Sequence, residues 1–307
     1  MRMIVLGSAA GGGLPQWNCA CANCTRARAG DPAVRPRTQS SIAVSADGRR
    51  WVLLNASPDL RQQMAAAPAL APPYPPRSTA LAGVLVTNAD IDHVAGLLSL
   101  REAQSFVVHA TARVHSILDA NPVFDSLDRS LVRRRTIGIG ASVDLETADG
   151  EATGLSATLF PVPGKVALYL EDARAEHDLA GEAGDTVGVE IRGGGKRILY
   201  IPACARIDDD LLERARGADL LLFDGTLWED GEMVRMGLSA KTGRRMGHVS
   251  VSGADGTIAR FAGVAVGRKV LIHLNNSNPL LADDSPERAA ATRAGWEVAY
   301  DGQEFTT

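Results

Sequence analysis

One seven-residue stretch, TNADIDH at positions 87–93, decides the fold class. It follows a short apolar run, Gly83–Val86, that predicts a strand, and it precedes a segment with helical spacing. Two carboxylates and an imidazole therefore lie where a strand passes into a helix. If the stretch is extended, the side chains of Asp90 and Asp92 project to one side, and His93 can turn back at the start of the helix.

This acidic-histidine stretch has two interpretations. Three ligand-type side chains on one turn can bind a divalent ion with little loss of chain entropy, and carboxylates with imidazole suit Fe(II), Mn(II) or Zn(II). Aspartate is also favoured at helix N-termini, where it caps the helix and complements its dipole. Asp92 could serve only in that way, so the stretch alone leaves both interpretations open.

The composition excludes several classes of protein. The chain has 307 residues, 45% of them hydrophobic and 22% charged, which is typical of a folded globular protein and not of a disordered or coiled-coil one. Its net charge of -4 argues against a nucleic-acid partner. No apolar run approaches the roughly 20 residues of a membrane helix, and Met1–Leu6 is too short for a secretory signal. We therefore expect a cytoplasmic protein without a membrane partner.

Short apolar runs bounded by Gly, Pro or Asn dominate the chain. They predict strands at 3–6, 41–44, 51–55, 83–87, 157–162, 187–191, 196–201, 219–224, 269–273 and 297–300. Helical spacing occurs at 94–104, 110–121, 207–216, 253–262 and 286–294. This order favours two layers of β-sheet with helices outside them.

Three of the four cysteines, Cys19, Cys21 and Cys24, fall within six positions. A CxCxxC triplet in a tight loop is typical of a structural Zn(II) site, because thiolates bind zinc at about 2.3 Å and one loop can surround the ion. The site needs a fourth ligand, for which Cys204 is a candidate by residue type. The alternative is three free thiols, and a disulfide is disfavoured in a reducing compartment.

The stretch at 87–93 resembles the HxHxDH signature of the metallo-β-lactamase superfamily, with Asn88 and Asp90 in place of the first two histidines. Further segments match in order along nearly the whole chain. They are LGSAAGGG at 6–13, NASPD at 55–59, VAG at 94–96, MGH at 246–248 and IHLNNSNP at 272–279. Together with PQWNCAC at 15–21 and FDGTLW at 223–228, the last of these is similar to the coenzyme pyrroloquinoline quinone (PQQ) synthesis protein B family. The resemblance implies an α/β fold, a four-layer αββα sandwich, formed by one domain over 1–307 with a cysteine-rich zinc loop at 15–26.

The superfamily pattern implies two adjacent metal ions. This chain lacks several of the ligands that the pattern requires for the first of them. Besides the two replaced histidines, no histidine falls near 161–165, where a third is expected; the nearest, His177, lies in a polar excursion. The bridging aspartate should follow the strand at 198–201, where the chain reads Pro-Ala-Cys. What remains is a set for one ion: Asp90, Asp92, His93 and His273. Such a set leaves open coordination positions and resembles non-haem Fe(II) oxygenase sites, so we expect Fe(II) there.

Related phosphodiesterases imply roles for two further residues. They carry an acidic residue and a histidine where this chain has Asp224 and His248. We expect His248 to act as a general acid-base or substrate contact, with Asp224 fixing its tautomer and favouring its protonated form. The alternative is that Asp224 starts a turn and His248 is structural. A related phosphodiesterase also implies Asn276 as a fourth zinc ligand.

Other polar residues are candidates for substrate binding. Lys241 and Arg245 precede His248 and could bind substrate carboxylates, although such a run is also typical of a solvated face. The same two interpretations, binding of substrate carboxylates and a solvated face, stay open for Lys165. Asn275 and Asn276, beside His273, could offer amide hydrogen bonds to a polar substrate.

The resemblance implies a role in PQQ biosynthesis, which starts from a Glu and a Tyr of a precursor peptide. The expected reaction is Fe(II)- and O2-dependent hydroxylation of the tyrosine ring of a Glu-Tyr-derived precursor. Two alternatives stay open: binding and carriage of PQQ or its precursor without chemistry, and metal-dependent hydrolysis. The expected partners are a quinone precursor or Glu-Tyr-derived dipeptide and dioxygen, and the sequence leaves a homodimer open.

Overall fold

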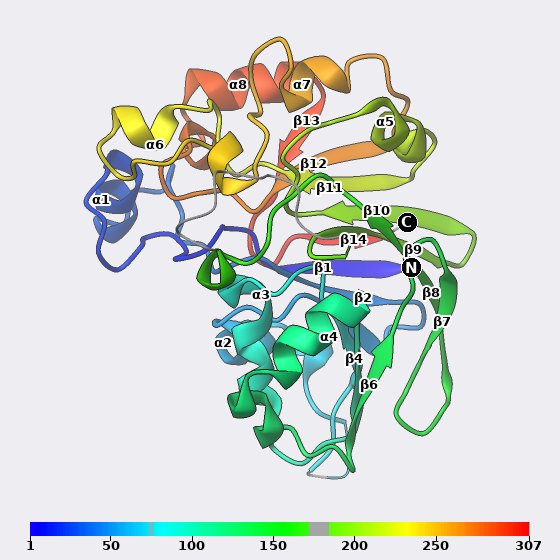
Figure 1. Cartoon of the computed structure of the whole chain (residues 1–307). Coiled ribbons are helices and arrows are strands. Elements are labelled where there is room, and N and C mark those ends of the chain that lie inside the picture. The colour runs from blue at the N-terminus through cyan, green and yellow to red at the C-terminus, as the bar shows by residue number, and fades with distance from the viewer. Residues whose placement is uncertain (74, 76, 172–183, 307) are drawn as a thin grey trace.

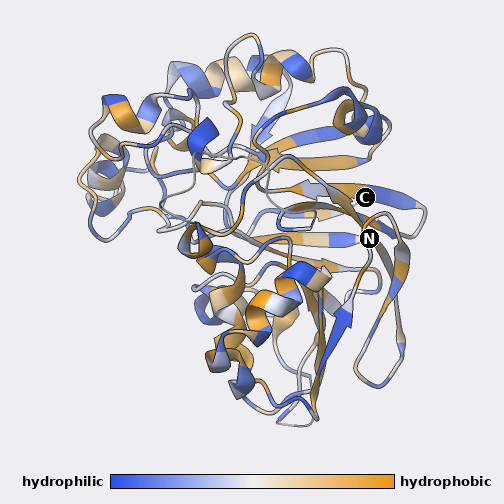
Figure 2. Cartoon of the chain, viewed as in Figure 1, coloured by the Kyte–Doolittle hydropathy of each residue, from blue (hydrophilic) through white to orange (hydrophobic). Residues whose placement is uncertain are grey.

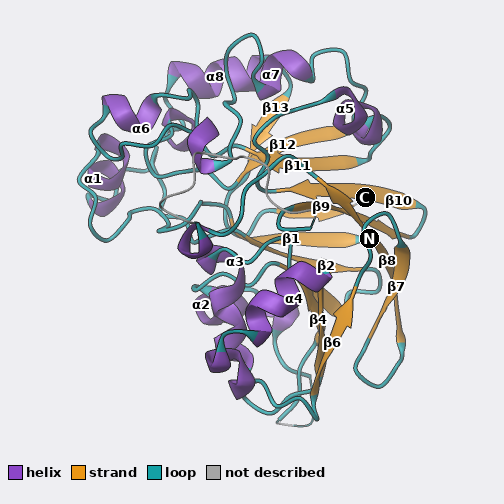
Figure 3. Ribbon diagram, viewed as in Figure 1, coloured by secondary structure: helices purple, strands orange, loops and turns teal. Residues whose placement is uncertain are grey.

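The computed structural model describes residues 1–73, 75, 77–171 and 184–306. Within these residues, two seven-stranded sheets pack against each other, with helices on their outer faces (Figures 1 and 3). The first sheet has the order β14 (Glu304–Thr306), β1 (Arg2–Gly7), β2 (Ser41–Ser45), β3 (Trp51–Leu54), β4 (Leu81–Leu85), β5 (Phe106–Ala110) and β6 (Val132–Thr136). The second has the order β13 (Trp296–Val298), β12 (Arg268–Ile272), β11 (Leu220–Asp224), β10 (Lys196–Ile201), β9 (Val187–Gly193), β8 (Ala152–Pro161) and β7 (Ser142–Glu146).

Helices form the outer layers. The α-helices among the described residues are α1 (Ala22–Arg28), α2 (Leu60–Ala66), α3 (Ile91–Val94), α4 (Ala112–Asp119), α5 (Asp209–Ala215), α6 (Glu232–Arg235), α7 (Thr257–Arg260) and α8 (Pro286–Arg293). In Figure 1, α2 and α4 lie on the first sheet, and α7 and α8 lie on the second. The predicted four-layer αββα sandwich of the metallo-β-lactamase type is therefore the observed fold.

The core divides into three apolar clusters that match these layers. The inner cluster joins the two sheets, for example through Leu85 of β4 and Leu222 of β11. On β11 the neighbouring residue Phe223 belongs instead to the outer cluster under α7 and α8. Because successive side chains of a strand point to opposite faces and both faces are covered, the central strands are continuously apolar. Figure 2 shows this contrast between apolar strands and helices of mixed polarity.

Parallel pairing brings several strand ends to one edge of the molecule. In the second sheet β10, β11 and β12 are mutually parallel, and in the first sheet β3 pairs parallel with β4. The carboxyl ends of parallel strands lie at the same edge, where α/β proteins bind their ligands. The chain leaves β4 toward Asp90, ends β11 at Asp224 and leaves β12 into His273. The predicted site residues therefore converge.

Some elements were predicted wrongly or missed. The helix expected at 94–104 is the last residue of α3 followed by a 3-10 turn, Ala95–Leu100. Strand β5, Phe106–Ala110, was not predicted, and only its last residue fell in the helix expected at 110–121. All five residues of β5 are buried, and a short apolar run does not by itself distinguish a strand from a buried helix. Strands β6, β7 and β14, each at or next to a sheet edge, were also not predicted, and in β6 three arginines interrupt the apolar pattern.

No helix among the described residues has the length and apolar character needed to cross a bilayer.

Candidate metal centre

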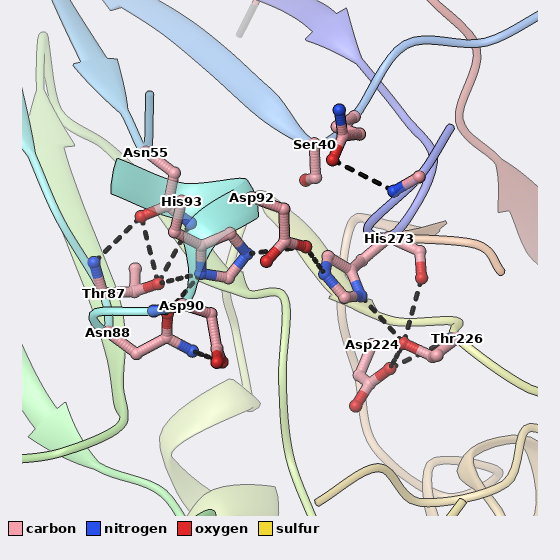
Figure 4. A network of polar contacts seen from close by, with 12 residues as sticks. Ser40, Asn55, Thr87, Asn88, Asp90, Asp92, His93, Asp224, Thr226 and His273 are labelled. Atoms are coloured by element: carbon pink, nitrogen blue, oxygen red, sulfur yellow. Dashed lines mark hydrogen bonds and ion pairs between the residues drawn. The ribbon is translucent and has the colours of Figure 1, made fainter. Parts of the chain in front are cut away.

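Asp92, His93 and His273 form the centre of the site. Their ligand atoms, one from each residue, all lie within 4.8 Å of one another. Asp92 Oδ2 is 3.0 Å from His273 Nε2 and 4.0 Å from His93 Nε2, so the carboxylate lies between two imidazoles (Figure 4). The three side chains come from the first turn of α3 and the end of β12, which are 181 positions apart along the chain.

Asn88 sets the orientation of His93. The His93 Nδ1–H group donates to Asn88 Oδ1 at 2.6 Å, which leaves Nε2 with its lone pair free. That Nε2 atom is buried and has no hydrogen-bond partner among the described residues. A buried polar atom without a partner is costly, and an imidazole whose other nitrogen is anchored by an acceptor is the usual state of a metal ligand. The donor set of Asp92, His93 and His273 therefore fits a divalent ion.

His273 is held in an unusual backbone conformation. Its φ of 61° lies in the left-handed region that residues other than glycine rarely adopt, and such strain is common at functional sites. Thr226 supports the ring, because Thr226 Oγ1 lies 2.9 Å from His273 Nδ1 and 2.7 Å from Asp224 Oδ1. The hydroxyl can accept from the imidazole and donate to the carboxylate. This arrangement leaves His273 Nε2 directed at Asp92.

Asp224 and His248 form the predicted pair. Asp224 is fully buried, and its Oδ2 accepts from His248 Nδ1 at 2.8 Å and from the Cys204 amide at 2.9 Å. Oδ1 accepts from the Thr226 amide at 3.0 Å as well as from its hydroxyl. Asp224 thus forms the turn that we gave as the alternative and also orients His248. The rings of His248 and His273 stack with centroids 5.3 Å apart, which places His248 beside the centre.

These contacts shift the pKa values of the centre in different directions. Burial lowers the pKa of His93 to about 4, so its imidazole is neutral and able to ligate. Burial alone would raise the pKa of Asp92 and lower that of His273. At the low pH where Asp92 titrates, His93 is protonated, and its charge together with the hydrogen bond from His273 outweighs burial, so the pKa of Asp92 is lowered. For His273 the hydrogen bond to Asp92 raises the pKa.

A second group of possible ligands shares His273 with the first. Asp224, His248 and His273 also have ligand atoms within 4.8 Å of one another. The two Asp224 oxygens, however, already accept four hydrogen bonds, whereas His93 Nε2 in the first group has no hydrogen-bond partner in the part of the chain that the structure describes. We therefore interpret Asp224 and His248 as a hydrogen-bonded pair rather than as a metal site.

Asp90 lies apart from the three central ligands. Its Oδ2 accepts from Asn88 Nδ2 at 3.1 Å, and its Oδ1 accepts from the Leu168 amide at 3.2 Å. Burial and the nearby charge of Asp92 raise the pKa of Asp90. Asp90 precedes α3 as its N-cap residue but makes no side-chain capping bond, so helix capping does not explain it. Its role as a ligand stays a prediction.

The cysteine triplet forms a separate group. The thiols of Cys19, Cys21 and Cys24 lie within 4.8 Å of one another at the start of α1. Asn276 Nδ2 donates to Cys24 Sγ at 3.3 Å and to Cys21 Sγ at 3.6 Å, so Asn276 lies beside the thiols through its amide nitrogen, and its role as an oxygen ligand of zinc stays a prediction. These contacts favour the cysteine site over substrate binding for Asn276. Cys204 is not in the group; its buried thiol lies 3.1 Å from the Arg206 carbonyl oxygen.

The other residues predicted to bind substrate fall into two groups, one bonded within its own loop and one gathered around a carboxylate. Asn275 is buried and donates to Ser277 Oγ at 2.5 Å, so its amide is already used within the loop. Lys165, Lys241 and Arg245 come together around one carboxylate, that of Glu171. His177 lies outside the described residues.

Sequence reasoning missed three residues of the site. Asn88 was interpreted as a lost ligand, although it orients His93; Thr226 and Glu171 were not singled out. Thr226 carried a signal, because it follows the strand-ending Asp224 in the FDGTLW stretch. Nothing local to Glu171 distinguishes it from other surface glutamates.

The fold and the site define a member of the metallo-β-lactamase superfamily. The family model of the beta-lactamase superfamily domain matches residues 50–274. Solved structures of low sequence identity share the fold, such as a diphosphatase of the PhnP family at 20% identity and a TM-score of 0.65, covering 99% of this chain and 97% of the other.

Closer relatives assign the family. The chain is 54% identical over 302 residues to the Coenzyme PQQ synthesis protein B of Methylorubrum populi, covering 98% of each chain. It is 54% identical over 305 residues to that of Gluconacetobacter diazotrophicus, covering 99% of each. The crystal structure of Zn(2+)-bound PqqB from Methylobacterium extorquens matches with 51% identity and a TM-score of 0.95 over the full length of both chains. The chain belongs to the coenzyme PQQ synthesis protein B family.

Proposed function

We propose that this protein acts in PQQ biosynthesis by hydroxylating the tyrosine ring of a Glu-Tyr-derived precursor with Fe(II) and dioxygen. The place in the pathway is supported by the names of the relatives. The reaction is supported by one observation above all: the centre presents two imidazoles and one carboxylate, with His93 Nε2 buried and unpartnered. Two histidines and a carboxylate with open positions are typical of non-haem Fe(II) oxygenases.

In this proposal Asp92, His93 and His273 hold the metal ion. A bound Fe(II) ion would supply the one-electron and dioxygen chemistry that protein side chains lack. Zinc is bound in the Methylobacterium extorquens relative, and imidazole and carboxylate ligands accept either ion. Asn88 and Thr226 fix the two rings, so that the ligand nitrogens are preorganised.

His248 is the residue proposed to move protons. Asp224 holds its Nδ1–H group, so Nε2 is left to exchange a proton with a substrate oxygen such as the tyrosine hydroxyl. The His248 side chain is 14% exposed, so a substrate at the mouth of the site can reach it. Because the Asp224 oxygens are saturated with hydrogen bonds, this carboxylate positions the imidazole and does not itself react.

The direct test is anaerobic reconstitution with Fe(II), followed by dioxygen and a Glu-Tyr dipeptide. We expect a product heavier by one or two oxygen atoms in mass spectrometry, and none from His273→Ala. Turnover by His273→Ala at the wild-type rate would refute the site assignment. Tight PQQ binding without turnover by any metal-loaded form would instead support the carrier, and phosphodiester cleavage with Mn(II) or Zn(II) would support the hydrolase.

A further inference from the structure

Three cationic side chains converge on Glu171 near the metal centre. Glu171 Oε1 pairs with Lys165 Nζ, and Oε2 lies 3.1 Å from Lys241 Nζ and 3.4 Å from Arg245 Nη2. The Glu171 side chain is 15% exposed and that of Lys165 is 13% exposed, so this central pair is largely withdrawn from water. Lys241 and Arg245, at 37% and 31% exposed, close the cluster on its solvent side. Surface ion pairs, by contrast, are mostly well exposed and contribute little.

The segment that carries Glu171 runs from the His248 loop to the Asp90 loop. At its start, the aliphatic stem of Lys165 packs against Gly247, where an added Cβ would come within 3.1 Å of Lys165 Cγ. At its end, the Leu168 amide donates to Asp90 Oδ1 at 3.2 Å. The Tyr169 hydroxyl donates to the Ala89 carbonyl oxygen at 3.0 Å. The cationic cluster is thus fixed between the two loops that bear His248 and the metal ligands.

The charges of this cluster do not balance. Among the described residues, Glu171 is the carboxylate that pairs with Lys165, Lys241 and Arg245, which leaves two positive charges in excess. Guanidinium and ammonium groups recognise carboxylates, and a partly buried excess of them favours a further anion. Burial alone would raise the pKa of Glu171, but hydrogen bonds from Lys165 and Lys241 lower it to about 2, so Glu171 is ionised.

We propose that Lys165, Lys241 and Arg245 form a subsite for a substrate with two carboxylates, and that Glu171 is an internal carboxylate which this substrate displaces. The inference rests on the proposed function, since it places the carboxylate end of the substrate beside the metal centre. It adds the residues that bind the substrate carboxylates and an internal competitor for them. Glu171 keeps the cations paired in the free protein. It lowers the apparent affinity for the substrate, because the substrate can bind only during the fraction of time in which Glu171 leaves the subsite open.

The alternative is that Glu171 only stabilises the loop through its three ion pairs. In that case removal of its charge would leave three unpaired cations and a weaker fold, with no gain in anion binding beyond non-specific attraction. The two accounts predict opposite changes for a small dicarboxylate that lacks the tyrosine ring.

The experiment measures glutarate binding to the zinc-loaded protein by calorimetry, where no redox turnover occurs. We expect Glu171→Gln to tighten glutarate binding about fivefold to tenfold. Adding Arg245→Ala to that variant should remove the gain. Glu297→Gln is the matched control, because Glu297 pairs with Arg268 at 2.7 Å on a distant strand, and it should leave binding unchanged.

Unchanged or weaker glutarate binding in Glu171→Gln, with the fold intact by circular dichroism, would overturn the proposal. If Glu171→Gln does not fold, glutarate binding is measured in Glu171→Asp instead. The shorter aspartate side chain holds its carboxylate farther from the cations, so we expect a smaller increase in glutarate affinity. An equal gain with the monoanion glutaramate would also overturn the assignment to a dicarboxylate. A gain for glutarate in a protein without hydroxylase activity would leave the subsite standing and reject only the proposed function.

Discussion

The two groups of possible metal ligands in this molecule are built in opposite ways. The cysteine group comes from one short loop and the start of α1, and its three thiols lie within six positions. The Asp92, His93 and His273 group instead joins the ends of strands in two different sheets. A local loop can wrap an ion and hold the chain together, whereas strand ends held by a packed core place ligands precisely for chemistry.

The hydrogen bonds around the two groups differ in the same sense. His93 and His273 are each anchored at Nδ1, by Asn88 and Thr226, so that their Nε2 atoms face a common point. The thiols are instead contacted by groups of their own loop and by Asn276: the Gln16 amide donates to Cys24 Sγ, the Cys21 amide donates to Cys19 Sγ, and the Asn276 amide donates to Cys21 and Cys24. In our proposal the reaction therefore belongs to the first group, and the second has a structural role.

The largest effect should come from replacing a central ligand. Asp92→Ala removes the carboxylate between the two imidazoles, so we expect hydroxylation to fall more than about a hundredfold, beyond the usual effect of losing an outer hydrogen-bond partner. Asp90→Ala is the matched control, because Asp90 lies two positions away and contacts Asn88 and Leu168 instead. Equal losses in both variants, measured in the same turnover assay, would place Asp90 among the ligands.

A smaller effect is expected at the residue that orients His93. Asn88→Ala leaves Nδ1 without its acceptor and frees the ring to rotate, so metal affinity should fall about 10–100-fold. Competition with a chromophoric chelator measures this affinity. Cys24→Ala in parallel should leave the affinity of the Asp92 centre unchanged, and a loss there would show that the two groups are not independent.

The cysteine group should affect stability more than turnover. Loss of zinc in Cys24→Ala is expected to lower the free energy of unfolding by about 3 kcal/mol and Tm by about 6–12 °C. Differential scanning calorimetry measures the shift, and turnover below the transition should stay near that of wild type. Loss of turnover with an unchanged Tm would assign the chemistry to the thiols.

The smallest effect concerns the pH dependence of the metal-free protein. His93 has a pKa of about 4 when folded and about 6.5 when unfolded, so between these values the unfolded state binds more protons and stability falls as the pH falls. His273 acts with the opposite sign, because its pKa is raised in the folded state. Comparison of His93→Asn with wild type isolates the contribution of His93 to the pH dependence of stability. In urea unfolding from pH 7 down to pH 4, the variant should lose less stability than wild type as the pH falls, and parallel profiles would contradict the burial of a neutral His93.

Local spacing was enough to predict the cysteine group, whereas the pairing of His248 with Asp224 was implied by the resemblance to related phosphodiesterases. The strand ends at 87–93, 224 and 273 also carried enough signal to predict the fold class and the three central ligands. These features are either contiguous in sequence or belong to the motifs that resemble the family.

The roles of Asn88 and Glu171 could not be predicted from the sequence. Asn88 stands where the superfamily has a histidine, so the motif suggests a loss, and only the 2.6 Å contact shows that it orients His93. Glu171 meets Lys241 and Arg245 across 70 and 74 positions, a separation that no local pattern reports. Strands β5 and β6 were missed because burial and edge position, which depend on the whole fold, decide their conformation.

Element-resolved metal analysis of the protein purified without added metal tests the central claim most directly. The account predicts one iron and one zinc ion per chain in wild type, with the iron alone lost in His273→Ala. Two ions bound by the aspartate and histidine groups, or iron retained by His273→Ala, would contradict it.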